Sequence, residues 1–385
     1  MSRLLDVAVV GGGPVGLFLG LLLVKQGFFV RVFDRREAPR LESRSIGIHP
    51  VSLECFAGAG IVHTFLQRGR RIRRGRVFTG SRQIGTLSFA TCPPPYPFIL
   101  TLPQKETEYV LEAELHRASP DVLCRGEEVE GIVQDADGVE VAVRSVHCSK
   151  VRVVRARFAV GCDGHQSHVR KSVGISVRGS PYPDSFCMGD FLDGGQFEAD
   201  ACVFLCREGL VESFPLPGNQ RRWVISTEAR WKDPTASPMA EVIHRRTGVS
   251  VDIESNRYMS AFGVQREIVD QAISGRVLLA GDAAHVMTPI GGQGMNVGWM
   301  DAYDAAEVLA QVLTDSFEDT DTRLRLRSYN DRVLLRASRA VEQAEWNMCF
   351  GRADRAWWWR KLLAHLILLP GVRGGFARAF TMRRL

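Results

Sequence analysis

The sequence predicts an α/β fold with a parallel sheet flanked by helices, a second sheet of mixed strands and a C-terminal helical segment. An apolar segment at residues 5–10 runs into a glycine-rich turn and a helical pattern, and a second apolar segment follows at 28–33. Apolar segments at 157–160 and 275–280 also end in glycine-containing turns. Residues 181–265 instead alternate apolar and polar side chains, which is typical of strands with one buried face.

Composition supports a globular protein of one or two domains. The chain has 385 residues, of which 45% are apolar and 24% charged, so disorder is excluded. Its nine cysteines are an odd number and contain no Cys-x-x-Cys pair, which argues against a disulfide framework or a zinc site. We therefore expect free thiols in a reducing cytoplasm and no bound metal. The first residues show no signal-peptide pattern, and no uncharged apolar run is long enough for a membrane span.

The formal net charge of +6 is unevenly distributed. One cluster of six arginines lies between residues 68 and 76, and further basic residues gather near the C-terminus. No stacking aromatic residues interleave the first cluster and no nucleic-acid motif is present, so we expect no nucleic-acid partner. Two interpretations of this arginine cluster stay open: a solvated edge, or a site for an anionic substrate carrier or lipid headgroups.

The glycine-rich turn after residues 5–10 has the pattern expected for a dinucleotide site. Gly11, Gly13 and Gly16 form G-x-G-x-x-G, and a helical pattern over 15–26 begins inside it. The first glycine permits a tight turn, the second allows a pyrophosphate close to the backbone, and the third allows the helix to pack near the strand. Free amides at the helix N-terminus then face the phosphates.

An acidic residue completes this unit. Asp34 follows the strand predicted at 28–33, close to the spacing of about 20 residues at which an acid binds the adenosine ribose. A carboxylate there disfavours a 2′-phosphate, so the Rossmann-like unit predicts FAD or NAD rather than NADP.

Two later segments add polar residues at strand ends. The strand at 157–160 leads to Asp163 and Gly164, and the strand at 275–280 leads to Asp282. Because ligands bind beyond the carboxyl ends of parallel strands, Asp282 is placed to bind a polyol. A glycine-rich loop and a helix predicted at 296–313 follow, with free amides at the helix start.

In this order, the three segments resemble the signature of the FAD-dependent aromatic hydroxylase superfamily, the group A flavoprotein monooxygenases similar to para-hydroxybenzoate hydroxylase and the ubiquinone-biosynthesis hydroxylases. The resemblance extends from Val7 to about Ala310. It implies a discontinuous FAD-binding domain and a mixed-sheet substrate domain that covers the flavin. We assign residues 1–75, 98–178 and 270–330 to the first, 76–97 and 179–269 to the second, and 331–385 to a C-terminal helical tail.

The resemblance also implies roles for single residues. Gly11, Gly13, Gly16, Asp34 and Arg35 would hold the ADP half, Arg44 would meet the pyrophosphate, and Gln104 would contact FAD. Asp163 and Gly164 match a motif thought to serve both FAD and the pyridine nucleotide, and Asp282 would bind the ribitol. Pro289 would sit at the reactive edge of the flavin. The residues expected along the isoalloxazine are Gly292, Gly294, Met295 and Asn296.

The implied reaction is a hydroxylation. Reduction of FAD by NADH or NADPH and reaction with oxygen would give a flavin C(4a)-hydroperoxide, which would oxygenate an aromatic or quinone-like, lipophilic substrate of secondary metabolism. Pro289, His285 and His49 are the catalytic candidates, although a structural imidazole is the alternative for both histidines. A prenyl or polyene reductase and a flavin-dependent halogenase of the same superfamily remain alternatives. Phe214 and Phe262 are candidates for the pocket wall.

The tail leaves one question open. Residues 357–369 combine three tryptophans, basic residues and an apolar run. Such a segment suits either a helix packed on the protein's own surface or peripheral contact with a membrane. The sequence does not indicate an oligomeric state.

Overall fold

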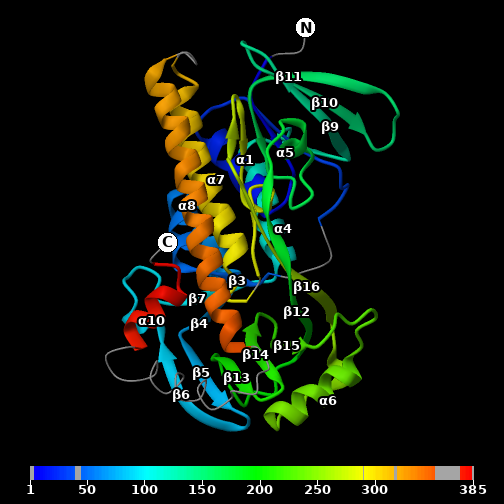
Figure 1. Cartoon of the computed structure of the whole chain (residues 1–385), viewed down its shortest axis with the longest axis vertical. Helices are drawn as coiled ribbons and strands as arrows, with labels where there is room; N and C mark the ends of the chain where they lie inside the picture. The colour runs from blue at the N-terminus through cyan, green and yellow to red at the C-terminus, as the bar shows by residue number, and fades with distance from the viewer. Residues whose placement is uncertain (1–3, 40–44, 289, 316–318, 352–372, 384–385) are drawn as a thin grey trace.

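The computed structural model describes residues 4–39, 45–288, 290–315, 319–351 and 373–383. Two eight-stranded sheets and a three-stranded sheet are combined with helices, which confirms the predicted α/β class. The first large sheet and its helices form the upper part of the molecule in Figure 1, and the second large sheet forms the lower part.

The first sheet has a parallel centre. Its main order is β17-β18-β11-β1-β2-β8, and β1 pairs in parallel with both β11 and β2. An antiparallel pair, β9 and β10, extends from β11. Five of the six residues of β1 are apolar and buried, as is typical of a central strand in a parallel sheet, and the exception is Asp6. The bounds are β1 Leu5–Val10, β2 Val30–Asp34, β8 Leu123–Arg125, β9 Glu127–Gln134, β10 Val139–Ser145, β11 Val151–Gly161, β17 Ile273–Ser274 and β18 Val277–Leu279.

Helices complete this part of the fold. Helix α1 packs against α4 and α7, and α7 packs against the 32-residue helix α8. Eight consecutive residues of α1, Gly16 to Leu23, are buried, because the helix is enclosed by the sheet and its neighbours. The bounds are α1 Pro14–Lys25, α2 Pro50–Gly58, α3 Val62–Arg68, α4 Gln104–Ala118, α5 His168–Ser172, α7 Gln293–Val312 and α8 Thr320–Gly351.

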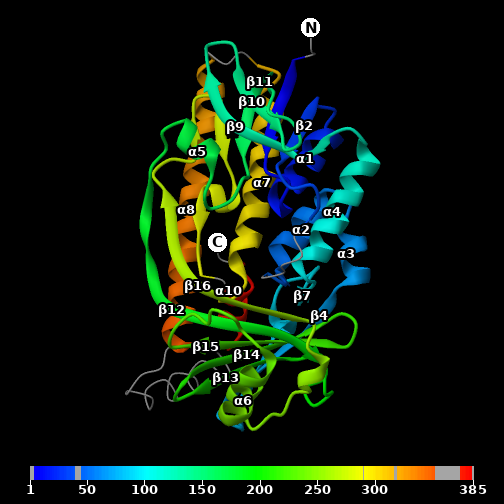
Figure 2. The same ribbon diagram turned by 90° about the vertical axis from the view of Figure 1, so that its right-hand side faces the viewer.

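The second sheet has the order β19-β16-β12-β15-β14-β13-β5-β6. Its pairs are antiparallel except β13 with β5, which are parallel. The long strands β12 and β16 run from the upper part into this sheet (Figure 2). The bounds are β5 Arg74–Thr79, β6 Arg82–Ser88, β12 Val177–Leu192, β13 Ala201–Cys206, β14 Gly209–Leu216, β15 Gln220–Thr227, β16 Tyr258–Val269 and β19 His285–Val286.

One face of the second sheet is closed by helix α6, Ala236–Thr247, which contacts β12, β13, β14 and β15. A small third sheet has the order β3-β7-β4 (Gly47–Ile48, Ile99–Thr101 and Arg70–Ile72). In chain order, its strands fall between strands of the first and second large sheets. Helix α10, Arg373–Phe380, contacts β6. Three short 3-10 segments are η1 Phe89–Thr91, η2 Ile253–Ser255 and η3 Gly281–Ala283. The strands divide into two sheets near the domain boundaries that we propose from the sequence.

Candidate functional site

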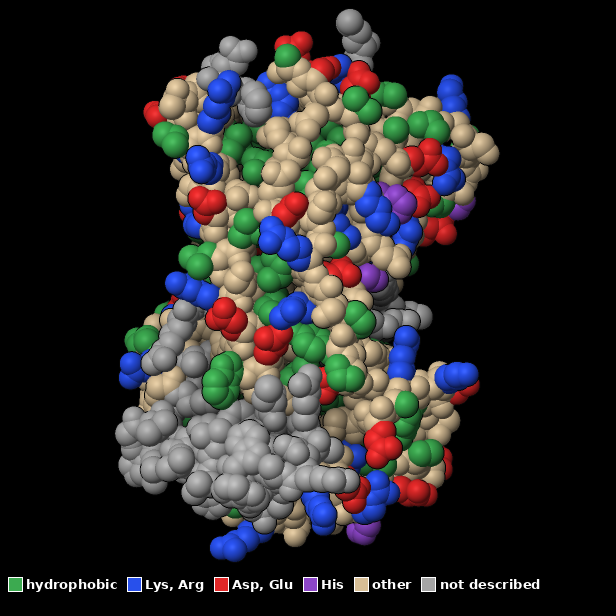
Figure 3. Space-filling view, viewed as in Figure 1, with side chains coloured by type: hydrophobic (Ala, Val, Ile, Leu, Met, Phe, Trp, Pro, Cys, Tyr) green, Lys and Arg blue, Asp and Glu red, His purple; other side chains and the backbone are tan. Residues whose placement is uncertain are grey.

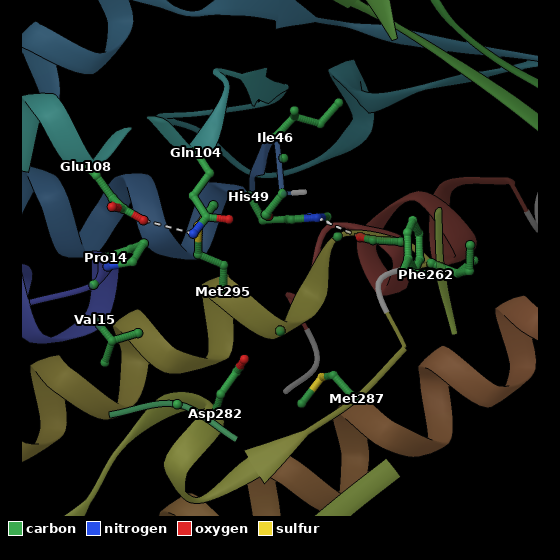
Figure 4. A pocket seen from close by; sticks show the side chains of 18 of the residues that line it. Pro14, Val15, Ile46, His49, Gln104, Glu108, Phe262, Asp282, Met287 and Met295 are labelled. Atoms are coloured by element: carbon green, nitrogen blue, oxygen red, sulfur yellow. Dashed lines mark hydrogen bonds between the residues drawn. The ribbon is translucent and has the colours of Figure 1, made fainter. Parts of the chain in front are cut away.

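A cavity of about 630 Å³ is bordered by both large sheets. Its lining includes the turn after β1, the ends of β2 and β11, the start of α4, the turn η3, the start of α7 and the inner face of the second sheet. Figure 4 shows Gln104 and Asp282 reaching this space from different elements, with Met295 between them. Segments that are far apart in the sequence therefore meet in one site of the size typical for small-molecule ligands.

The glycine turn provides open backbone at one end of the cavity. Gly11 has a φ of +106°, and a Cβ there would lie 2.3 Å from the carbonyl oxygen of Cys162. A Cβ on Gly16 would lie 1.9 Å from the Gly11 oxygen, so this glycine allows close packing of α1. Gly13 differs, because a Cβ there would meet nothing within 4 Å and the residue lines the cavity. Helix α1 begins at this point without a side-chain cap, which leaves amides available to an anion.

Asp34 lies beside this turn and is held by an arginine. Its carboxylate accepts a hydrogen bond from the Gly12 amide at 2.6 Å and from Nε and Nη2 of Arg36 at 3.0 and 2.8 Å. Burial acts to raise the pKa of Asp34, but Arg36 outweighs it and the pKa is lowered. The buried aspartate is therefore charged at neutral pH and lies at the cavity wall, as the ribose assignment requires.

Arg36, rather than its predicted neighbour Arg35, completes this cluster. The side chain of Arg35 is 60% exposed and faces Glu128 at 3.8 Å, although the residue borders the cavity. Arg36 also approaches Glu108 at 3.6 Å. Both arginines follow the end of β2 in irregular backbone, so no strand pattern in the sequence indicated which side chain would turn back to Asp34.

Gln104 opens helix α4 and lines the cavity, at the predicted position. Its amide donates a hydrogen bond to Oε1 of Glu108 at 2.9 Å (Figure 4). Glu108 is 1% exposed, and its Oε2 is buried without a hydrogen-bond partner among the described residues. Burial raises the pKa of Glu108. Glu108 was not predicted, since its place one helical turn after Gln104 becomes meaningful only when the helix axis is known.

The Asp163 turn lies opposite Gly11. The carboxylate of Asp163 accepts hydrogen bonds from the amides of His168 and Val169 at 2.7 and 3.1 Å, which fixes the start of α5. Its other oxygen is buried and has no hydrogen-bond partner in the described part of the chain, and both Asp163 and Gly164 line the cavity. Arg170 donates to the carbonyl of Ala283 at 2.9 Å, so this segment is tied to the turn that carries Asp282.

The start of α7 forms another wall. Gly292, with a φ of +66°, precedes the helix and no side chain caps it. Gly292, Gly294 and Met295 line the cavity as predicted. Asn296 does not; its amide instead donates to the carbonyls of Gly47 and Gly292, and its oxygen accepts from the amide of His49. Its side chain therefore positions the wall from behind, and contact of its backbone with the cofactor stays a prediction.

The two histidine candidates occupy different places. His49 lines the cavity, and its Nε2 lies 3.0 Å from the carbonyl oxygen of Gly291. Burial lowers the pKa of His49 to about 4, so its ring is neutral at pH 7 and donates this hydrogen bond. A neutral, buried imidazole that holds a loop carbonyl fits a positioning role.

His285 lies behind the wall. Its Nε2 is 2.5 Å from Oδ2 of Asp301, both side chains are fully buried, and His285 does not line the cavity. Asp301 also accepts from Arg336 at 2.9 Å and from the Gly281 amide at 3.1 Å. Burial acts to raise the pKa of Asp301, but His285 and Arg336 outweigh it, so the pKa is lowered. This placement argues against the predicted proton role of His285 and for a structural one.

The second sheet supplies an apolar wall. Met188, Val203, Leu210, Val224 and the predicted Phe214 and Phe262 line the cavity from neighbouring strands. Pro215 does not, because alternate residues of a strand face opposite sides. Charged residues in this wall are Arg76 and Arg222, paired with Asp200 and Asp190, and Glu212. No sequence signal marked Glu212, since its facing depends on the strand register.

The described residues fit an adenine dinucleotide with an attached ring system. Two uncapped helix starts, the open Gly13 backbone and the charged Asp34 meet the needs of phosphates and a ribose. Buried carboxylate oxygens without hydrogen-bond partners in the described ranges occur at Asp163 and Glu108, and both residues line the cavity. Two predicted residues, Arg44 and Pro289, and the tail at 357–369 lie outside the described residues.

Comparison with known families agrees with this geometry. A family model described as "FAD binding domain" matches residues 4–344. The chain belongs to this FAD-binding family. Membership confirms the resemblance to the FAD-dependent aromatic hydroxylase superfamily that the glycine turn and the two aspartate segments indicate.

Several relatives of this FAD-binding chain carry names. It is 34% identical over 312 residues to a rifampicin monooxygenase of Streptomyces venezuelae, covering 79% of this chain and 64% of that protein. It matches CabE, described as an aromatic hydroxylase from angucycline biosynthesis, with 28% identity and a TM-score of 0.78, over 99% of this chain and 76% of the other. The p-nitrophenol 4-monooxygenase of Pseudomonas putida shares the fold, with 22% identity, a TM-score of 0.87 and coverage of 100% and 98%.

The arginine cluster at 68–76 is largely paired in this FAD-binding chain. Arg74 and Arg76 bind Asp200 at 3.0 and 2.7 Å, and Arg71 and Arg73 lie over the ring of Phe98. Basic and acidic side chains alternate over the face in Figure 3. The ion pairs and ring contacts of the arginine cluster favour its interpretation as a solvated edge. Among the described residues, no helix combines the length and apolarity that crossing a bilayer requires, and no cluster of His, Cys, Asp or Glu is arranged for a metal.

Proposed function

We propose that this protein is an FAD-dependent monooxygenase that uses NADH or NADPH and oxygen to hydroxylate an aromatic or quinone-like substrate. One observation supports the proposal above the others: a single cavity extends from the dinucleotide turn at Gly11 and Asp34 to an apolar wall on the second sheet. A cofactor bound along the first part would present its ring to a compound lying against the second. The chain spans 64% of the length of the rifampicin monooxygenase, so activity and substrate are proposals.

In this proposal each wall has a distinct task. The amides at the starts of α1 and α7 would bind negative charge, Asp34 would bind the ribose, and Asp282 the ribitol. Bound FAD supplies the redox and oxygen chemistry, and the protein binds, orients and excludes water. His49 holds the Gly291 carbonyl and so fixes the loop that leads into α7.

The apolar second sheet would keep the reacting ring dry. Phe262 and Phe214 offer aromatic surface, and Val203 and Val224 add apolar surface to the same wall. Such a wall selects a lipophilic ring over a charged metabolite. CabE is described as an aromatic hydroxylase from angucycline biosynthesis, and the likeness to it supports a role for this chain in secondary metabolism. The free thiols support a cytoplasmic location, and membrane contact by the tail remains a prediction to be tested by liposome flotation.

The test is NADH and NADPH consumption by the purified, FAD-loaded chain across a panel of phenols, naphthols, polycyclic phenols and quinones. We expect at least one compound to stimulate consumption about tenfold or more, with one atom of oxygen-18 gas appearing in the product. A reductase would give a product without labelled oxygen, and a halogenase would require halide. Flavin-loaded protein whose NAD(P)H consumption no aromatic compound stimulates would refute the proposal.

A further inference from the structure

Glu212 is an ionisable side chain in the apolar wall of the cavity. It lies in the middle of β14, is 7% exposed and lines the cavity. No hydrogen bond or ion pair joins its carboxyl group to any of the described residues. Burying a carboxyl group without a partner costs free energy, so its presence there requires an explanation.

The surroundings of Glu212 are apolar on both sides. Its cross-strand neighbours are Val203 of β13 and Val224 of β15, and both line the same cavity. Two residues away along β14, Leu210 and Phe214 point to the same side. Burial is the cause that raises the pKa of Glu212, to about 7.

The charged residues nearby are already engaged. Arg222 contacts Asp190 through two hydrogen bonds of 2.6 and 2.8 Å, and its guanidinium also lies over the Tyr258 ring at 5.0 Å. Arg76 binds Asp200 at 2.7 Å. Glu212 therefore differs from the other charged residues of this wall: they have protein partners, and it faces the cavity.

We propose that Glu212 binds the substrate, accepting a hydrogen bond from a hydroxyl group on its aromatic ring. This inference rests on the proposed function, because only that function makes the bound compound a substrate. The hydrogen bond itself requires only that an aromatic compound occupies the cavity. Apart from the ion-paired Arg76 and Arg222, the described wall around Glu212 is apolar. A ring would therefore pack against the valines and phenylalanines while its hydroxyl group meets the carboxyl oxygen. A compound that lacks the donor would leave Glu212 buried and unpaired, which is how a buried polar group confers selectivity.

Calorimetric titration of the FAD-loaded full chain tests this inference. The ligands are phenol, 2-naphthol and 2-hydroxyanthracene, each compared with its methyl ether, which keeps the ring and the oxygen but lacks the donor. We expect the wild type to bind at least one hydroxyarene about tenfold or more tightly than its ether. In Glu212→Leu this preference should fall below about threefold, and in Glu212→Gln, which keeps a neutral acceptor, it should be intermediate.

A matched control is Glu241→Gln, since Glu241 is exposed on α6 of the same domain and should leave the preference unchanged. A preference that survives in Glu212→Leu, or a wild type that binds no hydroxyarene more tightly than its ether, would overturn the inference. If Glu212→Leu fails to fold, the Gln variant carries the test. Calorimetry does not depend on turnover, so discrimination through Glu212 in a protein that transfers no oxygen would refute the proposed function alone.

Discussion

The two sides of the cavity are built in different ways. On the cofactor side the binding groups are backbone amides, glycines and carboxylates fixed by partners, such as Asp34 with Arg36. On the substrate side they are side chains of a sheet face, mostly apolar, with Glu212 unpaired among the described residues. In the proposed function, cofactor binding would therefore depend on chain geometry, whereas substrate selection would depend on which side chains share one face.

The largest expected effect separates two glycines of the same turn. Gly11→Ala should prevent recovery of soluble, FAD-loaded protein, because left-handed backbone costs about 1–3 kcal/mol for alanine and its Cβ would lie 2.3 Å from the Cys162 oxygen. Gly13→Ala should unfold in urea within about 0.5 kcal/mol of the apo wild type, yet bind FAD more than tenfold more weakly, since its Cβ enters the cavity. If Gly13→Ala bound FAD as tightly as the wild type, the open backbone at Gly13 would not be part of the FAD site.

A buried network behind the cofactor wall should rank next. Asp301→Ala leaves His285 without its carboxylate partner and removes one of the two carboxylates that Arg336 contacts, and removing one member of a buried ion pair costs about 3–5 kcal/mol. Urea unfolding measures that loss. His285→Gln should also destabilise the protein but leave substrate-stimulated NAD(P)H consumption per bound FAD within about threefold. A stable His285→Gln protein with normal FAD content and no turnover would show that His285 acts in the chemistry.

On the proposed substrate side, replacing Glu212 should stabilise the protein at high pH, whereas the preceding substitutions destabilise it. The pKa of Glu212 is raised by burial from 4.5 to about 7, so the folded state holds its proton more tightly than the unfolded state does. Its stabilising contribution is full below pH 4.5 and is lost as the pH rises through 7. At about 1.4 kcal/mol per pKa unit, Glu212→Gln should make the protein up to about 3 kcal/mol more stable, relative to wild type, at pH 8.5 than at pH 4.5.

Urea unfolding at the two pH values gives this comparison, with Glu241→Gln as the control. Arg76 and Arg222, the other charged residues of the wall, are ion-paired with Asp200 and Asp190. An identical stability difference at both pH values would mean that Glu212 is not buried as described.

The smallest expected effect distinguishes two neighbouring arginines, Arg36 and Arg35. Arg36→Ala removes the partner of Asp34 and should weaken FAD binding about tenfold, since hydrogen bonds to charged groups contribute about 1.5–3 kcal/mol and a reoriented carboxylate loses part of its own. Arg35→Ala should change FAD affinity less than twofold, because exposed ion pairs contribute little. Fluorescence titration with FAD measures both, and the reverse order would restore the sequence-based assignment of Arg35.

The sequence predicted most of the cofactor side. Gly11, Asp34 and Asp282 are found at the cavity, because turn geometry and the ends of strands, which local patterns reveal, place them there. Gln104, which only the family resemblance indicated, also lines the cavity. It did not predict Arg36 or Glu108, since these are defined by the direction of a side chain. It offered His285 as a catalytic candidate with a structural imidazole as the alternative, and could not decide between them because the partner Asp301 lies in another element.

The substrate side was predicted only in outline. The strands β13, β14 and β15 occur where alternating residues predict them, but alternation gives two faces and does not say which one borders the cofactor. Glu212 lies beside Val203 and Val224 on three neighbouring strands. This alignment depends on the strand register, which appears only in the folded sheet.

We propose that one cavity holds FAD beside an apolar substrate wall. The most direct test is reconstitution of the purified full chain with FAD, followed by removal of free flavin and an absorption spectrum of the protein. The account predicts a yellow protein with one FAD per chain, whose flavin spectrum shifts when a bound naphthol or larger hydroxyarene is added. A colourless protein that retains no flavin after reconstitution would contradict it.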